Sequence, residues 1–303
     1  RASLIDGVVP PDVNWQTEVQ VSFWGAIEGL SNACMADPLC SDAYGPVDQA
    51  LLDMITNLDA DPLVVGGDRG PMMEITGADA AGVIRRMMYS TALYPIIPLV
   101  ITSFRDRNLE PVEELLMELF GGGGPGDGIA EGMHWSVKCS DLFNPEIGPG
   151  IEVTLMEAQI PEPLATLAMV SHDDVVELCE SWPKPTPDPS LATPVNSGVP
   201  TLVSSGSFDP VTPPSFGETV GASLTNAREV VFANSGHGAI LGGDCSTGLA
   251  VAFLLDPQGV VDAYDTSCAD EIGLQFMVTA QSLLEGLTPA KKLAIQRQLR
   301  RGQ

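Results

Sequence analysis

Residues 201–214, TLVSSGSFDPVTPP, join an apolar run to an acid and then to a pair of prolines. The run at 201–206 predicts a buried strand, and the prolines end it because they cannot donate hydrogen bonds to a neighbouring strand. Asp209 therefore lies just past the carboxyl end of a strand. An acid in this place usually orients a catalytic base, which in turn activates a nucleophile.

Strands and helices alternate downstream of this stretch. Residues 213–226, PPSFGETVGASLTN, predict a helix, residues 228–234, REVVFAN, a second strand, and residues 246–256 a final helical region. Upstream, residues 2–9, ASLIDGVV, predict another buried strand that ends at two prolines. Alternation of strand and helix is typical of parallel sheets, so the predicted fold class is α/β.

A histidine follows the second strand, in the sequence SGHGA. Because the carboxyl ends of parallel strands meet at one edge of a sheet, Asp209 and His237 are expected to lie close together. A carboxylate so placed accepts the Nδ1–H of the imidazole and fixes its tautomer, as in a catalytic acid and base. Each residue alone also fits a structural role, Asp209 as a helix cap and His237 as a loop histidine. Their joint placement favours the catalytic pair.

Apolar residues change to helical spacing between residues 13 and 183. The residues at 51, 52, 55 and 58 share one predicted helical face, and those at 112, 115, 116 and 119 share another. The predicted organisation is a core strand at 1–12, a helical insertion at 13–198 that ends in a proline-rich linker, and an α/β core at 199–303. Glycine-rich residues 121–128 follow a helix, which predicts a loop and argues against a dinucleotide-binding turn.

Charge excludes several partners. The chain has 14 basic and 40 acidic residues, a net charge of −26 that repels nucleic acid and anionic lipid. The uncharged run at 87–104 contains Pro95 and Pro98, so it predicts two packed helices and no membrane span. The basic residues near the C-terminus fit a solvated terminal helix.

Six cysteines make an even count without a C-x-x-C pair or the spacing of a zinc site. Disulfides are the better interpretation, and they predict a secreted or periplasmic protein. Sequence alone leaves their connectivity open. The cysteines are Cys34, Cys40, Cys139, Cys179, Cys245 and Cys268.

The stretch 199–240, VPTLVSSGSFDPVTPPSFGETVGASLTNAREVVFANSGHGAI, resembles the C-terminal part of the tripeptidyl-aminopeptidase-like α/β-hydrolases, relatives of the proline iminopeptidases. The segments LIDGVVPPD, GMHWSVKCSD and LCESWP are similar to other parts of that family. The resemblance implies the C-terminal portion of an α/β-hydrolase fold with a large, mainly helical cap. It also implies that Asp209 and His237 are the triad acid and base, that the cysteines pair sequentially, and that the site uses no cofactor or metal.

The nucleophile of that family is a serine in a G-x-S-x-G turn that precedes the first strand found here. The sequence contains no G-x-S-x-G, and Ser3, Ser205 and Ser207 do not stand between a strand and a helix as that turn requires. The serine and the oxyanion hole are therefore expected on an N-terminal half of the same protein. Chain 1–303 alone is expected to be inactive.

The resulting hypothesis is the acid–base half of a secreted serine hydrolase that acts on a peptide or ester substrate. An aminopeptidase needs a carboxylate for the substrate's α-amine, for which Glu131 and Asp141 are candidates, while Trp135 is a candidate apolar wall. The alternatives are a carboxylesterase of the same fold, a non-catalytic binding or assembly protein derived from it, and a hydrolase with an aspartate nucleophile for epoxides or halides.

Overall fold

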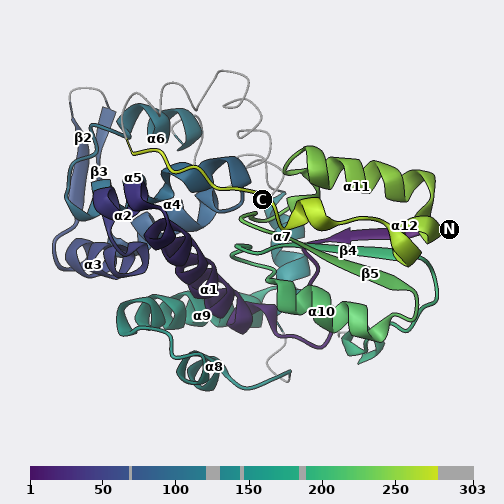
Figure 1. Cartoon of the computed structure of the whole chain (residues 1–303). Helices are drawn as coiled ribbons and strands as arrows, with labels where there is room; N and C mark the ends of the chain where they lie inside the picture. The colour runs from purple at the N-terminus through teal and green to yellow at the C-terminus, as the bar shows by residue number, and fades with distance from the viewer. Residues whose placement is uncertain (68–69, 121–129, 144–146, 184–188, 279–303) are drawn as a thin grey trace. The chain divides into compact units, whose positions relative to one another are not determined.

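The computed structural model of the chain describes residues 1–67, 70–120, 130–143, 147–183 and 189–278 (Figure 1). The chain forms two compact units. Unit 1 consists of residues 1–26, 129–160 and 169–273, and unit 2 of residues 27–128, 161–168 and 274–303. The predicted glycine-rich loop at 121–128 and the basic end of the chain lie outside the described residues.

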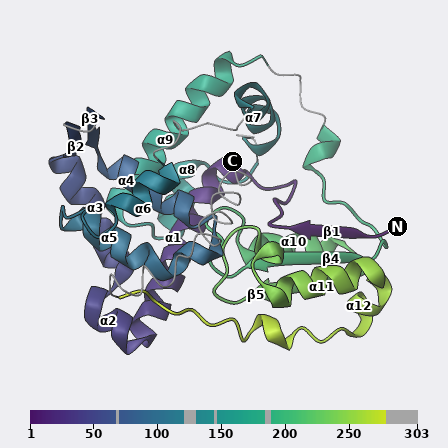
Figure 2. The same cartoon turned by 90° about the horizontal axis from the view of Figure 1, so that it is seen from above.

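Unit 1 contains a three-stranded parallel sheet in the order β1-β4-β5, and its strands lie side by side in Figure 2. The strands are β1 (Ser3–Asp6), β4 (Thr201–Gly206) and β5 (Ala227–Phe232). The register of β1 against β4 pairs Asp6 with Ser204. The parallel α/β arrangement predicted from the sequence is confirmed, although β1 ends at Asp6 and leaves Val8 and Val9 outside the strand.

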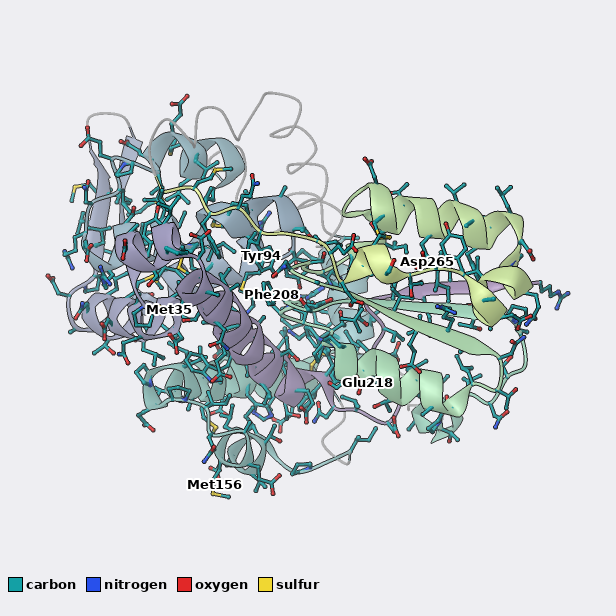
Figure 3. All side chains as sticks on the ribbon, in the orientation of Figure 1. Met35, Tyr94, Met156, Phe208, Glu218 and Asp265 are labelled. Carbon is teal, nitrogen blue, oxygen red and sulfur yellow. A yellow bond between two sulfur atoms is a disulfide. The ribbon has the colours of Figure 1, made fainter. Side chains whose placement is uncertain are left out.

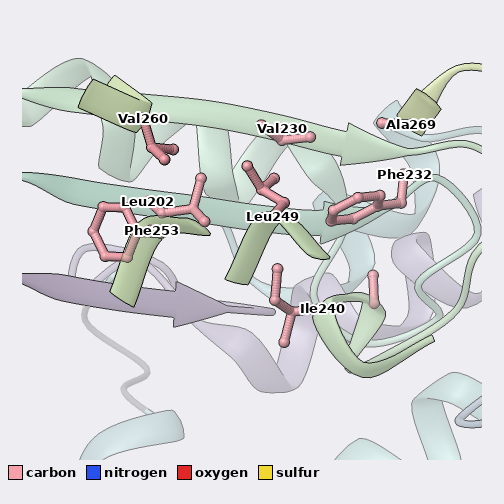
Figure 4. Packing of buried hydrophobic residues seen from close by; sticks show 9 residues of the cluster. Leu202, Val230, Phe232, Ile240, Leu249, Phe253, Val260 and Ala269 are labelled. Carbon is pink, nitrogen blue, oxygen red and sulfur yellow. The ribbon is translucent and has the colours of Figure 1, made fainter. Parts of the chain in front are cut away.

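Helices cover both faces of this sheet. Figure 1 shows α10 (Pro214–Ser223) on one face and α11 (Asp244–Leu255) with α12 (Pro257–Ala263) on the other. Leu202 on β4 packs with Phe253 of α11 and Val260 of α12 in a buried cluster (Figure 4). Side chains alternate along β4, so Val203 and Ser205 face α10 instead. Every residue of β4 is buried, as its uninterrupted apolar and small-residue run predicts.

The remaining elements of unit 1 are helices and turns, and a disulfide joins two of them through Cys139 and Cys179. Cys139 belongs to a π-helical turn, and together with Phe143 and Val175 it forms a second small core. The elements are α7 (Glu131–Val137), η2 (Lys138–Leu142), α8 (Ile151–Glu157), most of α9 (Glu162–Ser181), η3 (Pro189–Ala192), η4 (Ala239–Leu241) and η5 (Ser267–Ala269).

Helix α1 (Trp15–Ala36) begins in unit 1 and continues into unit 2. The core of unit 2 is built by α3, α4 and α5, whose apolar faces bury Leu51, Ile55, Ile84 and Ile101. A capping box between Thr76 and Asp79 fixes the start of α4. The other elements are α2 (Pro38–Tyr44), α3 (Val47–Ala60), β2 (Leu63–Gly67), β3 (Gly70–Ile75), α4 (Gly77–Met87), η1 (Thr91–Ile96), α5 (Ile97–Arg105) and α6 (Glu113–Phe120).

One part of the predicted helical region is not helical. Strands β2 and β3 form an antiparallel pair in unit 2, in which Leu63 pairs with Ile75. Glycines between two short apolar runs weaken a helix, so the two runs can form separate strands. The run at 87–104 forms η1 and α5, which agrees with the two packed helices expected around its prolines.

All six cysteines are paired, in the sequential order Cys34–Cys40, Cys139–Cys179 and Cys245–Cys268. Acidic side chains such as Glu218 and Asp265 lie on the surface, where water can solvate them (Figure 3). Within the described part of the chain, no helix is long and apolar enough to cross a bilayer.

Candidate active site

Asp209 lies in the loop that follows β4. Its Oδ1 accepts hydrogen bonds from the backbone N–H groups of Val211 at 2.9 Å and Thr212 at 2.8 Å. Its Oδ2 accepts a third from the Thr212 hydroxyl at 2.7 Å. Pro210 and Pro213 restrict the backbone of Asp209 and Thr212, the residues that precede them, and the Asp209 side chain is completely buried. The carboxylate is therefore held in one orientation by its own loop.

His237 lies in the loop after β5, and this loop is hydrogen-bonded to the one that carries Asp209. The backbone N–H of Phe208 donates to the carbonyl of Ser235 at 2.9 Å. The backbone N–H of Asn234 donates to the Ser207 hydroxyl, also at 2.9 Å. These bonds are possible because β4 and β5 are neighbouring parallel strands whose carboxyl ends meet at one edge.

The two side chains meet at hydrogen-bond distance. His237 Nδ1 lies 2.9 Å from Asp209 Oδ2 and 3.0 Å from Thr212 Oγ1. Because the Thr212 hydroxyl donates its proton to Asp209, both oxygens are acceptors for an Nδ1–H. A neutral imidazole in this tautomer carries its lone pair on Nε2. The arrangement suits a general base whose orientation is set by a buried acid.

The surroundings of His237 favour its charged form. Burial lowers the pKa of the imidazole, but the hydrogen bond to Asp209 and the negative charges of Asp209 and Asp6 outweigh burial, so the pKa is raised above its usual value. The His237 side chain is 26% exposed while that of Asp209 is fully buried. The imidazolium is thus stabilised on its buried side and is partly open to solvent.

Asp6 and Gly7, at the end of β1, complete the surroundings of the imidazole, and the sequence analysis assigned them no role. Asp6 ends β1, at the same sheet edge as Asp209 and His237. Gly7 has a φ of +64°, and a Cβ there would lie 2.9 Å from His237 Cε1 and from Thr212 Oγ1. Residues at the carboxyl ends of parallel strands meet at one sheet edge, which applies to Asp6 as it does to Asp209. The predicted strand ran to residue 9, however, so the sequence did not place Asp6 at a strand end.

The three predicted substrate-binding residues lie on or beside α7. Glu131 is exposed in its first turn, and Asp141 is exposed in the turn η2 that follows. Trp135 is half-buried, and the Lys138 ammonium lies 5.2 Å from its ring centre and 5.5 Å from that of Trp15.

Trp15 connects this group of residues to the loop of the acid. Its Nε1–H donates to the Val211 carbonyl at 2.9 Å, and the N–H of Val211 in turn donates to Asp209. The structure therefore brings Asp209 and His237 into direct contact. Trp135 is connected to them through Lys138, Trp15 and Val211.

The sequence was compared with known proteins and with models of protein families. No curated protein matches the chain. The segments 4–12 and 132–141, which contributed to the resemblance, lie outside the matched range. Residues 165–268, from within α9 to η5 and including Asp209 and His237, match the model of the TAP-like protein family.

Proposed function

We propose that this protein is the acid–base half of a secreted serine hydrolase, in which His237 is the general base and Asp209 orients it. The observation that carries the proposal is the 2.9 Å contact between His237 Nδ1 and a fully buried carboxylate oxygen of Asp209. An α/β-hydrolase domain at residues 165–268 supports the same chemistry. The substrate class proposed is a peptide with a free N-terminus, from which the enzyme releases residues or short peptides.

In the proposed mechanism, Nε2 of His237 takes the proton of a serine hydroxyl as the serine attacks the scissile carbonyl. The resulting imidazolium is stabilised by Asp209, whose Oδ2 accepts the Nδ1–H. His237 then gives its proton to the leaving amine, and an acyl-enzyme remains. A water molecule activated by the same nitrogen releases the acyl group.

The nucleophile is proposed to come from an N-terminal half that pairs with β1. Among the described residues, β4 is the only strand that pairs with β1, so the other edge of β1 can accept a further strand. All four residues of β1 are only half-buried, in contrast to the fully buried β4. Parallel strands are normally covered on both faces and paired within a sheet. A partner segment with G-x-S-x-G at β1 would complete both the sheet and the triad.

Residues 13–198 are proposed to act as a cap that selects the substrate. Glu131 and Asp141 are the carboxylates proposed to bind the substrate's α-ammonium, and Trp135 is the proposed apolar wall. Their exposure leaves the two carboxylates available to a ligand. The three disulfides support a secreted or periplasmic location, because such bonds persist in oxidising compartments.

The experiment that tests this function is fluorophosphonate labelling of the native protein with every chain that co-purifies, followed by intact mass spectrometry under non-reducing conditions. We expect a serine on an associated segment to take the label, and His237→Gln to abolish labelling. Asp270→Asn changes an exposed acid that has no role in the proposed mechanism and should label normally. A folded native protein that takes no label would overturn the proposal in favour of a non-catalytic binding role.

Substrate class is tested by turnover of matched compounds. A peptide anilide with a free amine should be cleaved, and its N-acetylated counterpart should react at least about tenfold more slowly, because an ion pair with the α-ammonium is lost. Preference for a simple carboxylic ester over both anilides would instead identify a carboxylesterase.

Thr212 provides a smaller prediction within the same site. Thr212→Val removes a hydroxyl that donates to Asp209 and accepts from the Nδ1–H, so kcat/KM should fall by about tenfold. Thr212→Ser keeps this oxygen and should retain at least about half of kcat/KM. Unchanged kcat/KM in Thr212→Val, measured by steady-state kinetics, would show that the hydroxyl does not contribute.

A further inference from the structure

Asp6 is a half-buried acid that the proposed mechanism does not use. Its Oδ1 accepts a hydrogen bond from the Ser204 hydroxyl of β4 at 2.7 Å. Its Oδ2 accepts one from the backbone N–H of Ile240 at 3.2 Å. Each oxygen thus joins the end of β1 to a different part of the sheet edge, one to the neighbouring strand and the other to the turn η4.

The bond to Ile240 fixes the segment that follows His237. Gly238 has a φ of +72°, and η4 (Ala239–Leu241) begins directly after it. On the other side of His237, Ser235 and Asn234 are already hydrogen-bonded to the loop after β4. The histidine turn is therefore held on both sides, upstream by the loop of the acid and downstream by Asp6.

Gly7, the residue after Asp6, packs against the imidazole. The backbone N–H of Gly7 donates to the Ser204 carbonyl at 3.0 Å, which places Gly7 against His237 Cε1. The imidazole is thus enclosed by Gly7 on one side and by Asp209 and Thr212 at its Nδ1.

A carboxylate at position 6 needs a reason, because the Ser204 hydroxyl and the Ile240 N–H that donate to it are both neutral. Burial raises the pKa of Asp6, while its hydrogen bonds to Ser204 and Ile240 and the charge of His237 oppose that rise. An asparagine in this place would avoid the cost of burying a charge. The titratable groups that face Asp6 are His237 and Asp209, so its charge acts on the same imidazole as Asp209 does.

We propose that Asp6 is a positioning residue of this site, whose carboxylate clamps the His237 turn to β1 and β4 and supplies a second negative charge to the imidazolium. The catalytic part of this inference rests on the proposed function. The effect of Asp6 on the titration of His237 is independent of the proposed function. The two can therefore be tested separately.

The test compares Asp6→Asn, Asp6→Ala and the control Asp270→Asn in the native protein with its associated chains. The chain has three histidines, so three Hε1 signals can be followed by NMR, and the one absent from His237→Gln is assigned to His237. In Asp6→Asn, loss of a negative charge should lower the pKa of His237. The acid limb of kcat/KM should then move to lower pH, because the base stays unprotonated further into acid.

The two variants should differ in turnover. Asparagine can still accept the Ile240 N–H, so Asp6→Asn should lower kcat by about tenfold with KM unchanged, whereas Asp6→Ala should lower it by about 100-fold. The Tm of Asp6→Asn at neutral pH should equal or exceed that of the native protein, since a buried charge is removed. A merely structural role would instead lower Tm and leave the His237 titration in place.

Each outcome decides one question. If His237 titrates at a lower pH in Asp6→Asn but no variant has hydrolase activity, the inference on Asp6 stands and the proposed function fails. If the native protein is active and Asp6→Asn leaves both the titration of His237 and kcat unchanged, the proposed function stands and the inference fails. Asp270→Asn should match the native protein in every measurement.

Discussion

Asp209→Asn is expected to lower kcat by about 10⁴-fold without unfolding the protein. The asparagine Oδ1 can still accept the N–H groups of Val211 and Thr212, so the loop should keep its shape. The amide nitrogen would then face His237 and donate to Nδ1. This reverses the tautomer, leaves a proton on Nε2, and removes the lone pair that has to accept the proton of the nucleophile.

Steady-state kinetics with the anilide substrate measure this loss, and circular dichroism with thermal melting shows that the variant is folded. Asp270→Asn serves again as the matched control, since it changes the same functional group at an exposed position. A folded Asp209→Asn protein that retains more than about one-tenth of native kcat would contradict the role proposed for Asp209.

Gly206→Ala is expected to lower the free energy of unfolding by more than about 3 kcal/mol. A Cβ at Gly206 would overlap the backbone carbonyl oxygens of Ser235 and Gly236. These atoms cannot swing aside as a flexible side chain would, because the Ser235 carbonyl is hydrogen-bonded to Phe208. Any protein that folds should also lose activity, since the displaced backbone immediately precedes His237.

Urea denaturation measures this effect, with Gly248→Ala as its control. Gly248 lies within α11, and nothing comes within 4 Å of a Cβ placed there. Alanine at that position should stabilise the helix by about 0.5–1 kcal/mol. Melting of Gly206→Ala within about 1 kcal/mol of the native protein would show that the two loops are less closely packed than the structure indicates.

The geometry around β4 and β5 could be predicted from the sequence because it follows from topology. An apolar run, a proline-flanked acid, a helix and a second strand specify parallel strands with their carboxyl ends at one edge. Asp209 and His237 stand at those ends, and their side chains lie 2.9 Å apart. Their catalytic role remains a proposal, which the variants above are designed to test.

The part played by Asp6 and Gly7 could not be predicted in the same way. It depends on where β1 ends, and strand ends are the least certain feature of a sequence pattern. The β2–β3 pair was missed because its few apolar residues sit between stretches of helical periodicity, and only the glycines indicate a turn. The mutual positions of Trp15, Trp135 and Lys138 depend on how separate segments pack, which periodicity does not encode.

The disulfide between Cys139 and Cys179 spans 40 residues of the chain and includes the segment at 144–146 and all of α8. A protease that cuts once between these two cysteines would leave both products joined. On a gel run without reductant such a nicked protein would migrate as an intact chain, and only added thiol would separate the fragments. Apparent homogeneity of a preparation should therefore be judged on reduced samples.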